Sequence, residues 1–308
     1  MDHSKPLVVV VVLNWNGRRD TEECLASLRK VTYGRFKVLL VDNASSDDSV
    51  PFVEEHFPEA EVVANAENLG FTGGNNVGMR RALEMGADWA LLLNNDTTVE
   101  PEFLTTLVSA AQADPRIGVI GPLINYYDPK DRVWFAGGRL SLTWGFSWHV
   151  GNRATDRGQY RGCIDEDFQT GAAMMISRRV LDEVGLLDEG LFIYFEDTDL
   201  SVRARKAGHR VVCCRDARIH HKISRAGGGG LTPAKAYTKV ISGAMFFRRH
   251  SGPWRYHTTV ALFNYAYAAA TALTKLLSGR WDVVRAIVRG FWHVLRGRNL
   301  AARAWKGR

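Results

Sequence analysis

Residues 7–17 read LVVVVVLNWNG, a run of seven apolar residues followed by two asparagines, a tryptophan and a glycine. An unbroken valine-rich run is typical of a strand that is covered on both faces, as the strands of parallel sheets are. Similar runs alternate with helical patterns after it, with strands expected at 36–41, 61–64 and 89–93 and helices at 19–30, 48–56, 74–85 and 101–113. This alternation predicts an α/β fold, in which helices flank a mostly parallel central sheet on both faces.

Polar residues stand at the ends of three of these predicted strands. They are Asn14-Trp15-Asn16-Gly17, Asp42-Asn43-Ala44-Ser45-Ser46-Asp47 and Asn94-Asn95-Asp96. Each group alone is typical of turns and helix caps. Three groups at one edge of one sheet indicate a ligand site instead, because such sheets bind ligands at the carboxyl ends of their strands.

Asp96 is the candidate metal ligand at this edge. A hard cation such as Mg2+ or Mn2+ prefers carboxylate oxygens and completes its shell with water and substrate phosphates, so one well-placed aspartate can hold it. Asn94 and Asn95 can add neutral oxygens. The glycine-rich segment 67–78 lets the backbone approach a ligand. It lacks the Gly-Lys-Ser/Thr ending of a P-loop, which disfavours nucleoside triphosphate hydrolysis.

A second cluster of acidic residues follows the aromatic run 192–195. Helix capping does not account for the adjacent Glu196 and Asp197. A carboxylate held against an apolar surface has a raised pKa and can act as a base, so one of this pair is a candidate proton acceptor. Further on, His220 and His221 follow a short strand expected at 211–214. A lone histidine is more often structural than a ligand, but Asp96 is a possible partner for one of them.

The net positive charge of the chain comes from its C-terminal part. Residues 248–308 hold 12 of the 40 Lys and Arg residues but one of the 33 acidic residues. The apolar stretch 254–277 allows a spanning helix, although its polar residues disfavour one. Residues 281–295 combine arginines with an apolar stripe, which predicts a helix lying on an anionic membrane surface. A helix packed on the rest of the chain is the alternative. No nucleic-acid motif accompanies the charge, so we expect no nucleic-acid partner.

The domain boundary and the compartment follow from simpler features. The glycine run 227–230, followed by Pro233, predicts a mobile break between two domains, 1–233 and 234–308.

The four cysteines lack the spacing of a zinc site or a disulfide framework and predict buried free thiols. The first apolar run is too short and wrongly flanked for a signal peptide. We therefore expect a cytoplasmic protein that associates peripherally with the inner face of the cell membrane.

Six ordered motifs carry a resemblance that extends from about residue 7 to residue 224. They are Asn14-Trp15-Asn16-Gly17, Val41-Asp42-Asn43-Ala44-Ser45-Ser46-Asp47, Glu67-Asn68-Leu69-Gly70-Phe71, Leu93-Asn94-Asn95-Asp96-Thr97, Thr170-Gly171-Ala172 and Phe195-Glu196-Asp197-Thr198-Asp199-Leu200. With these motifs in this order, the chain resembles the family 2 glycosyltransferases, which are inverting enzymes with the GT-A fold. It is most similar to the bacterial branch that includes rhamnosyltransferases.

The resemblance implies roles for individual residues. It implies that Asp197 is the catalytic base with Glu196 beside it, and that Asp96 binds the metal. His221 completes the metal site, with the adjacent His220 as the alternative. The nucleotide-diphosphate sugar is expected to contact Asn14, Asp42, Asn68, Gly70, Asn75, Asn94 and Asn95. Two departures from the family pattern are visible: Asn94 takes the first position of the DXD motif, which predicts weaker metal binding, and residues 240–243 lack an Arg-Asn pair.

The implied activity is inverting sugar transfer with Mg2+ or Mn2+ as cofactor. The donor is expected to be dTDP-rhamnose or a UDP-hexose, and the acceptor a saccharide or polyprenyl-linked molecule of cell-envelope polysaccharide synthesis. A sugar-nucleotide nucleotidyltransferase is one alternative, but it would show a glycine-rich loop with Arg and Lys early in the chain. A non-catalytic sugar-nucleotide-binding protein is the other, and it would not need both Asp96 and Asp197. The aromatic segment 134–162 fits either an acceptor-side loop or an exposed-edge hairpin.

Overall fold

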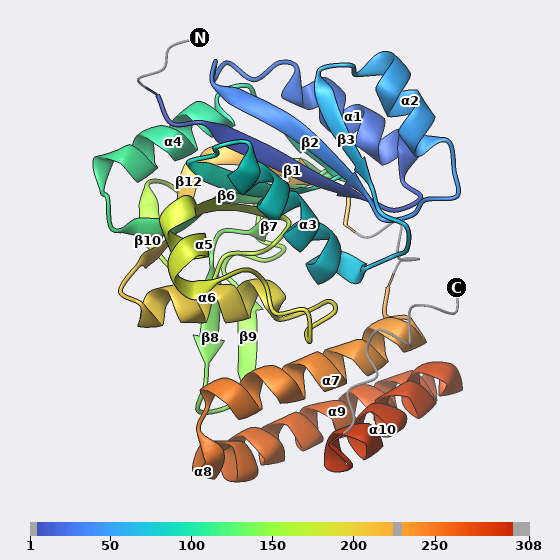
Figure 1. Ribbon diagram of the computed structural model, residues 1–308. Helices are drawn as coiled ribbons and strands as arrows, with labels where there is room; N and C mark the ends of the chain where they lie inside the picture. Colours follow the sequence, from blue (N-terminus) through green and yellow to red (C-terminus); the bar gives the residue numbers. More distant parts are fainter. Residues whose placement is uncertain (1–4, 224–229, 298–308) are drawn as a thin grey trace.

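The computed structural model describes residues 5–223 and 230–297, so most of the predicted glycine break, 227–229, lies outside the described residues. Figure 1 shows an α/β domain with a layer of C-terminal helices packed beneath it. The strands are β1 (Val8–Asn14), β2 (Phe36–Asp42), β3 (Ala60–Ala64), β4 (Trp89–Asn94), β5 (Thr97–Val99), β6 (Ile117–Tyr126), β7 (Val133–Phe135), β8 (Gly138–Ser141), β9 (Phe146–His149), β10 (Cys163–Asp165), β11 (Ala173–Ser177) and β12 (Arg210–His221). The helices are α1 (Arg18–Leu28), α2 (Ser49–His56), α3 (Gly70–Glu84), α4 (Phe103–Ala113), α5 (Arg178–Val184), α6 (Glu196–Lys206), α7 (Pro233–His250), α8 (Pro253–Arg255), the π-helical turn η1 (Tyr256–Val260), α9 (Ala261–Leu277) and α10 (Trp281–Leu295).

The central sheet has the strand order β10-β12-β6-β11-β4-β1-β2-β3, with β5 paired to β12 and β7 paired to β6. The strands β4, β1, β2 and β3 are parallel to one another, and β12 is parallel to β6. β11 lies antiparallel between β4 and β6. The predicted α/β fold with a mostly parallel sheet is therefore confirmed.

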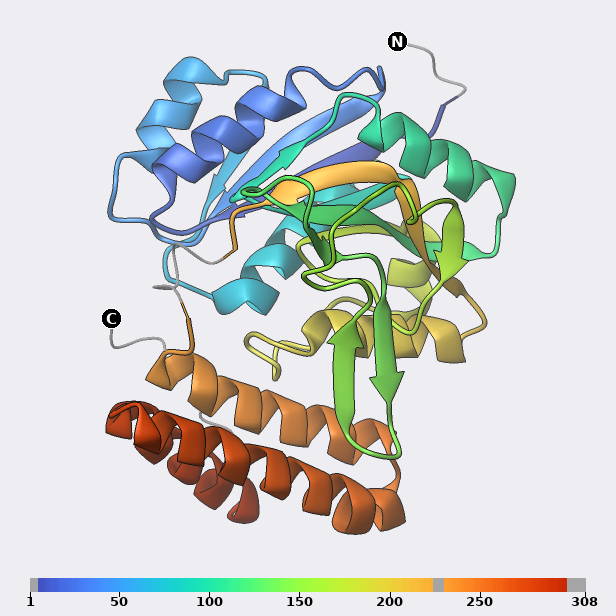
Figure 2. The same cartoon turned by 180° about the vertical axis from the view of Figure 1, so that it is seen from behind.

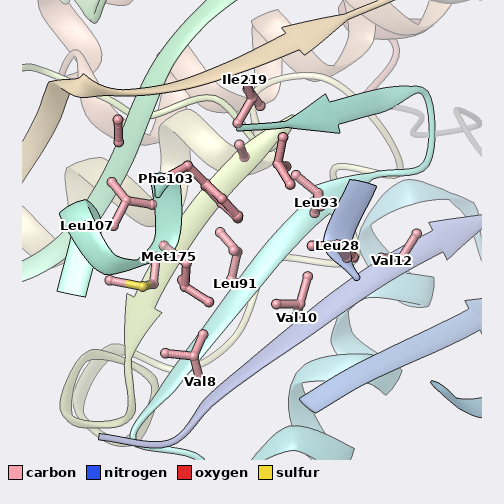
Figure 3. Packing of buried hydrophobic residues seen from close by; sticks show 14 of the residues in the cluster. Val8, Val10, Val12, Leu28, Leu91, Leu93, Phe103, Leu107, Met175 and Ile219 are labelled. Carbon is pink, nitrogen blue, oxygen red and sulfur yellow. The ribbon is translucent and has the colours of Figure 1, made fainter. Parts of the chain in front are cut away.

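Successive valines of β1 face opposite sides of the sheet. Val8, Val10 and Val12 pack with α1, α2 and α4 in one core, which Figure 3 shows from close by. Val9 and Val11 pack with α3, α5 and α6 in the other core. All five side chains are fully buried. Because both faces are covered, β1 has no alternation of apolar and polar residues.

α3 begins at Gly70, earlier than the start at residue 74 expected from the sequence. The glycines of this helix serve close packing on the sheet. A Cβ on Gly74 would lie 2.4 Å from Cδ1 of Leu13, and a Cβ on Gly78 would lie 2.2 Å from Cγ1 of Val11. The helix can approach β1 this closely because it has no side chains at these positions.

β12 is longer than the short strand expected at 211–214. It continues past a register shift between Cys214 and Arg218 and ends at His221, so both histidines belong to the strand itself. Three cysteines are buried free thiols, as expected. The expectation is wrong for Cys163, which is exposed because β10 forms the outer edge of the sheet.

α7 joins the sheet domain to the other C-terminal helices. On one side, Oγ of Ser242 donates a hydrogen bond to the carbonyl of Ile193 at 3.0 Å, and the rings of Phe195 and Phe246 stack with centroids 5.2 Å apart. On the other side, Gly290 of α10 lies against α7, where a Cβ would be 3.0 Å from Cγ1 of Val240. Figures 1 and 2 both show α7 between the sheet domain and the α9 and α10 pair.

α9 and α10 carry many large apolar side chains that the rest of the described chain leaves exposed. They are Leu262, Phe263, Tyr265, Tyr267, Leu273, Leu277, Trp281, Val288, Trp292 and Leu295, which we call the apolar surface of α9 and α10. The other face of α10 is buried on α7 through Val283, Ile287 and Gly290. By length and composition alone, the helical stretch Pro253–Leu277 is the described segment suited to crossing a membrane, and 6% of its most apolar window is buried.

Candidate active site

A cavity of about 1690 Å³ lies between the carboxyl ends of the strands, the loop before α6 and the C-terminal helices. Residues 94–96 at the end of β4 and His221 at the end of β12 line it. Glu196 and Asp197, the first residues of α6, also line it. The candidate metal ligands and the candidate base, which are far apart in the sequence, thus face one cavity.

Strand pairing brings Asp96 and His221 together. β5 begins directly after Asp96 and runs antiparallel to the end of β12, with Thr97 opposite His221. The backbone N–H of Lys222 donates to the carbonyl of Asp96 at 2.9 Å. Nε2 of His221 lies 2.9 Å from Oδ1 of Asp96, and both side chains are buried. The histidine next to Asp96 is therefore His221 and not its neighbour His220.

This pair has donor atoms that suit a divalent cation. Both ring nitrogens of His221 are buried, and apart from the contact of Nε2 with Asp96 neither has a hydrogen-bond partner among the described residues. Trp134 packs edge-on against the imidazole, with ring centroids 4.7 Å apart, and so fixes the plane of the ring. The described part of the chain brings no group of three or more His, Cys, Asp or Glu side chains together for a metal. A cation here would complete its shell with water and substrate phosphates, as Mg2+ and related ions do.

Asn14, Asp42 and Asn95 form a hydrogen-bond network at the strand ends. Nδ2 of Asn14 donates to Oδ1 of Asp42 at 2.7 Å, and Oδ1 of Asn14 accepts from Nδ2 of Asn95 at 3.0 Å. Asp42 also accepts from the backbone N–H of Ser45 at 2.8 Å. Asn95 lines the cavity, whereas Asn14 and Asp42 lie behind its wall. The network fixes the loops after β1, β2 and β4 relative to one another, and direct nucleotide contact by Asp42 stays a prediction.

Asn68 and Gly70 line the cavity at the start of α3, and Asn75 does not. Oδ1 of Asn68 accepts from the N–H of Gly70 at 2.8 Å. Gly70 has a φ of 75°, and a Cβ there would lie 2.4 Å from Cε2 of Phe192. Asn75 is buried, and its Nδ2 donates to the carbonyl of Phe71 at 2.9 Å. In the structure, Gly70 therefore allows the start of α3 to contact the loop before α6.

Three hydrogen bonds hold the carboxylate of Asp197. Oδ2 accepts from the N–H of Gly171 at 2.9 Å. Oδ1 accepts from the N–H and the hydroxyl of Thr198, at 2.6 and 3.0 Å. Burial raises the pKa of Asp197, and these bonds limit the rise because they favour the ionised form.

The pKa of Glu196 is raised much more strongly than the pKa of its neighbour Asp197. Burial, followed by the charge of Asp197, raises the pKa of Glu196 well above its ordinary value. Its Oε2 is buried and has no hydrogen-bond partner within the described residues. The pKa of Glu196 is therefore raised more strongly than that of Asp197, which favours Asp197 as the ionised member of the pair. The role of Asp197 as base stays a prediction.

The backbone before the pair is strained. Tyr194 and Phe195 have φ values of 73° and 68°, in the left-handed region that costs a non-glycine residue about 1 kcal/mol or more. These two residues turn the chain so that α6 starts at Glu196. Asp197 consequently lies in the first turn of the helix, where the helix dipole favours a negative charge.

Other residues that line the cavity were not among the sequence candidates. Lys235 and Lys239 enter it from α7, and His149 enters it from β9. Burial lowers the pKa of His149 to about 4, so this histidine is neutral at physiological pH. In the sequence, Thr232 and Pro233 indicate the start of a helix, and the four-residue spacing of the two lysines after them places both on one face of it.

The aromatic segment after β7 is a hairpin that also forms cavity wall. β8 and β9 pair antiparallel, and Figure 2 shows the hairpin reaching from the sheet domain to the C-terminal helices. Phe146 stacks on Phe263 of α9 with ring centroids 5.1 Å apart, and Nδ2 of Asn264 donates to the carbonyl of Gly145 at 3.2 Å. Phe146 and His149 also line the cavity. The segment therefore contains a hairpin that lines the cavity, and its role on the acceptor side stays a prediction.

Known sequences match this chain over most of its length. Residues 5–239 match the family described as Glycosyltransferase like family 2. The N-acetylglucosaminyl-diphospho-decaprenol L-rhamnosyltransferase of Mycobacterium tuberculosis is 30% identical over 267 residues, covering 80% of this chain and 86% of that protein. The low-salt glycan biosynthesis hexosyltransferase Agl10 of Haloferax volcanii is 24% identical over 209 residues, covering 67% of this chain and 64% of that protein.

Solved structures share the fold at low identity. GalNAc-T7 with UDP, GalNAc and Mn2+ has a TM-score of 0.62 at 18% identity, covering 86% of this chain and 54% of that chain. The mannosyltransferase PcManGT of Pyrobaculum calidifontis, with GDP-Man and Mn2+, has a TM-score of 0.57 at 16% identity, covering 97% of this chain and 78% of that chain. TarS 1-349 of S. aureus with UDP-GlcNAc has a TM-score of 0.58 at 15% identity, covering 92% of this chain and 80% of that chain. The chain therefore belongs to glycosyltransferase family 2 and adopts the GT-A fold, as its ordered motifs led us to expect.

Proposed function

We propose that the chain transfers a sugar with inversion from dTDP-rhamnose or a UDP-hexose to a saccharide or polyprenyl-linked acceptor of cell-envelope polysaccharide synthesis. The observation that carries this proposal is that one cavity holds the carboxylate of Asp197 and the pair of Asp96 and His221. The Mycobacterium tuberculosis relative, a rhamnosyltransferase named for a diphospho-decaprenol acceptor, supports both substrate classes.

Asp197 acts as the base. It takes the proton of an acceptor hydroxyl, the hydroxyl oxygen bonds to the anomeric carbon, and the bond from that carbon to the donor diphosphate breaks. Gly171 and Thr198 hold the carboxylate in place while it receives the proton. Glu196 stays neutral, so no second negative charge beside Asp197 competes for the proton. One base and one departing group imply a single displacement, and hence inversion.

The donor diphosphate is expected at Asp96 and His221. These two residues would hold Mg2+ or Mn2+, which supplies Lewis-acid stabilisation of the departing diphosphate when bound. The Mn2+ complexes of two structural neighbours support a cation at such a site. Trp134 contributes by holding the imidazole of His221 in one orientation.

The enzyme acts in the cytoplasm at the inner face of the cell membrane, to which residues 248–308 attach it peripherally. The apolar surface of α9 and α10 supports this, because side chains such as Trp292 and Leu295 remain 52% and 68% exposed. Arg285 and Arg289 are exposed on the same helix as those two residues, and Arg296 is exposed directly after its end. Arginines next to apolar side chains are typical of helices that lie on anionic lipid.

A donor screen tests the proposed function. The purified chain is incubated with dTDP-, UDP- and GDP-sugars, with and without Mn2+, and release of free nucleotide and thermal stabilisation are measured. We expect cation-dependent turnover and stabilisation by one donor class, since a ligand that binds the native state raises its melting temperature. Turnover of none of these donors, combined with no stabilisation by them, would contradict a transferase. Pyrophosphate release from a nucleoside triphosphate would indicate a nucleotidyltransferase instead.

A further inference from the structure

Two lysines of α7 face the cavity from the side of the C-terminal helices. Lys235 and Lys239 are four residues apart, so they lie on the same face of the helix. Nζ of Lys239 lies 5.0 Å from the ring centroid of Tyr194, which precedes Glu196 by two positions. The ammonium group is therefore placed beside the loop that carries the base, whereas Asp96 stands at the strand ends of the sheet.

Among the residues that the structure describes, no carboxylate balances the charge of Lys239. The side chain of Lys239 is accessible and lines the cavity. Among the described residues, the charged group that affects it is that of Lys235. Desolvation, followed by the charge of Lys235, lowers the pKa of Lys239, and no acidic residue in the described chain opposes this shift. Like charges four residues apart destabilise a helix. An anion that contacts both ammonium groups would relieve this repulsion through charge-assisted hydrogen bonds.

Beyond the lysines the cavity wall is mostly apolar, although Arg248, His257, Asn264 and Thr271 also line it. Val260, Ala268, Ile287 and Phe291 form part of it. The ring of Tyr265 packs on Phe291 with centroids 4.9 Å apart and belongs both to the cavity wall and to the apolar surface of α9 and α10. The lysines and the apolar surface are thus joined by one continuous wall. A ligand with a diphosphate at one end and a hydrocarbon chain at the other matches this arrangement in charge and in polarity.

We propose that Lys235 and Lys239 bind the diphosphate of a lipid-linked acceptor, whose hydrocarbon chain lies along the wall formed by α9 and α10. The inference rests on the proposed function and narrows the acceptor to a saccharide carried on a polyprenyl diphosphate. It gives the cavity two separate anion sites, one for the donor diphosphate at Asp96 and His221 and one for the acceptor diphosphate on α7. The donor diphosphate is the other possible source of the same chemistry, so the test separates the two.

Binding measured by calorimetry on the full chain provides this test. The probes are farnesyl diphosphate, farnesol and inorganic diphosphate, together with dTDP and UDP in the presence of Mn2+. The variants are Lys239→Gln, the double variant Lys235→Gln/Lys239→Gln and the charge-retaining Lys235→Arg/Lys239→Arg. The matched control, Lys30→Gln/Lys37→Gln, removes the same charge from two exposed lysines of the sheet domain. Thermal unfolding shows that each variant is folded, and Lys239→Gln serves alone if the double variant is not.

We expect farnesyl diphosphate to bind more tightly than farnesol or inorganic diphosphate. The glutamine variants should weaken it by about tenfold or more, as the loss of a hydrogen bond to a charged group predicts, while the arginine variant and the control retain it. Binding of dTDP and UDP should not change. Equal loss of nucleotide binding would assign the lysines to the donor and overturn the inference. Unchanged farnesyl diphosphate binding in the glutamine variants, or farnesol binding as tight as that of the diphosphate, would overturn it too.

The outcome is independent of catalysis. A chain that turned over no donor but lost farnesyl diphosphate on Lys239→Gln would contradict the proposed function and still support a lipid diphosphate site on α7. A chain that turned over its donor normally and bound farnesyl diphosphate equally well without the lysines would support the proposed function and contradict the lipid diphosphate site.

Discussion

Nε2 of His221 lies 2.9 Å from Oδ1 of Asp96, although the two residues are far apart in the sequence. The contact depends on the antiparallel pairing of β5 with the end of β12. It therefore ties the proposed metal site to the central sheet, and it distinguishes His221 from His220 in a way that can be measured.

Replacing Asp96 by Asn or His221 by Gln should weaken Mn2+ binding, because each change removes one donor atom of the pair. We expect a loss of about tenfold or more in affinity, since even changes one shell further out commonly cost that much. His220→Gln is the matched control and should leave the affinity unchanged. A titration followed by electron paramagnetic resonance of free Mn2+, with dTDP or UDP present, measures the effect. Equal losses from His220→Gln and His221→Gln would contradict the assignment of His221.

The adjacent acids Glu196 and Asp197 should respond very differently to amide substitution. Asp197→Asn removes the ionised base and should lower kcat by about 100-fold or more with nucleotide binding intact. Glu196→Gln replaces a protonated acid by a neutral side chain of the same shape and should retain most of the activity. Steady-state kinetics with the donor identified by the screen compares the two variants. Near-normal transfer by Asp197→Asn would show that another group takes the proton.

The rate of transfer should fall at acid pH as Asp197 becomes protonated. Because burial raises the pKa of Asp197, the acid limb of the profile of kcat/KM against pH should lie above the range of an ordinary aspartate. Thr198→Val removes the hydroxyl that donates to Oδ1 and favours the ionised form, so it should move this limb to higher pH. Thr106→Val, in which the lost hydroxyl bonds within α4, should not move it. A shift to lower pH in Thr198→Val would contradict the assignment.

Asp199 should be important for stability because it joins α6 to the end of α7. Its carboxylate is fully buried, accepts from Nε of Arg203 at 2.7 Å and lies 2.8 Å from Nε2 of His250. Burial raises the pKa of Asp199, but the bond to His250 and the charge of Arg203 outweigh this and bring it to about 2. Asp199→Asn should lower the free energy of unfolding by about 3 kcal/mol, since it leaves Arg203 and His250 without the carboxylate that contacts both.

The pH dependence of this loss has a definite sign. A depressed carboxyl pKa stabilises the native state above the unfolded pKa, and the stabilisation disappears as the pH falls towards the folded pKa. The difference between wild type and Asp199→Asn should thus be complete above about pH 5 and shrink towards pH 2. Urea unfolding at several pH values measures it, with the exposed Asp182→Asn expected to change stability by less than about 0.5 kcal/mol. A difference that grows on acidification would be inconsistent with this account.

The apolar surface of α9 and α10 should bind anionic vesicles. Replacing Trp281, Trp292 and Leu295 by Ser should abolish co-sedimentation with vesicles that contain phosphatidylglycerol, because these exposed side chains supply the apolar contact. Arg285→Gln/Arg289→Gln should weaken it by about 1 kcal/mol per charge. Ile164→Ser, which removes an exposed apolar residue from β10, serves as control. If the triple variant sedimented like wild type, a lipid-facing role for this surface would be wrong.

The sheet and the buried acidic pair could be predicted from the sequence because each leaves a local signal. The valines of β1 show no alternation of apolar and polar residues, which indicates two covered faces. Glu196 and Asp197 follow an aromatic run, which predicted the raised pKa values that burial produces. The sequence did not reveal how differently the two pKa values are shifted, because hydrogen bonds from Gly171 and Thr198 limit the rise at Asp197.

Features that depend on distant contacts could not be predicted in the same way. The helix over Gly74 and Gly78 was expected, but its close contacts with Leu13 and Val11 depend on how it packs against the sheet. Lys235 and Lys239 have a visible helical spacing, but only the packing of α7 shows that their face lines the cavity. The length of β12 was underestimated because a register shift after Cys214 interrupts its apolar pattern.

Because α7 contacts the loop before α6 on one side and α10 on the other, the C-terminal helices close the cavity as well as extending the chain. The strand ends and the C-terminal helices form opposite walls of this cavity, and they come from different stretches of sequence. Under the proposed function, substitutions in α9 and α10 would change the hydrocarbon that the cavity accepts without touching the proposed donor and base residues. Acceptor preference and donor chemistry would then be free to evolve separately within one enzyme.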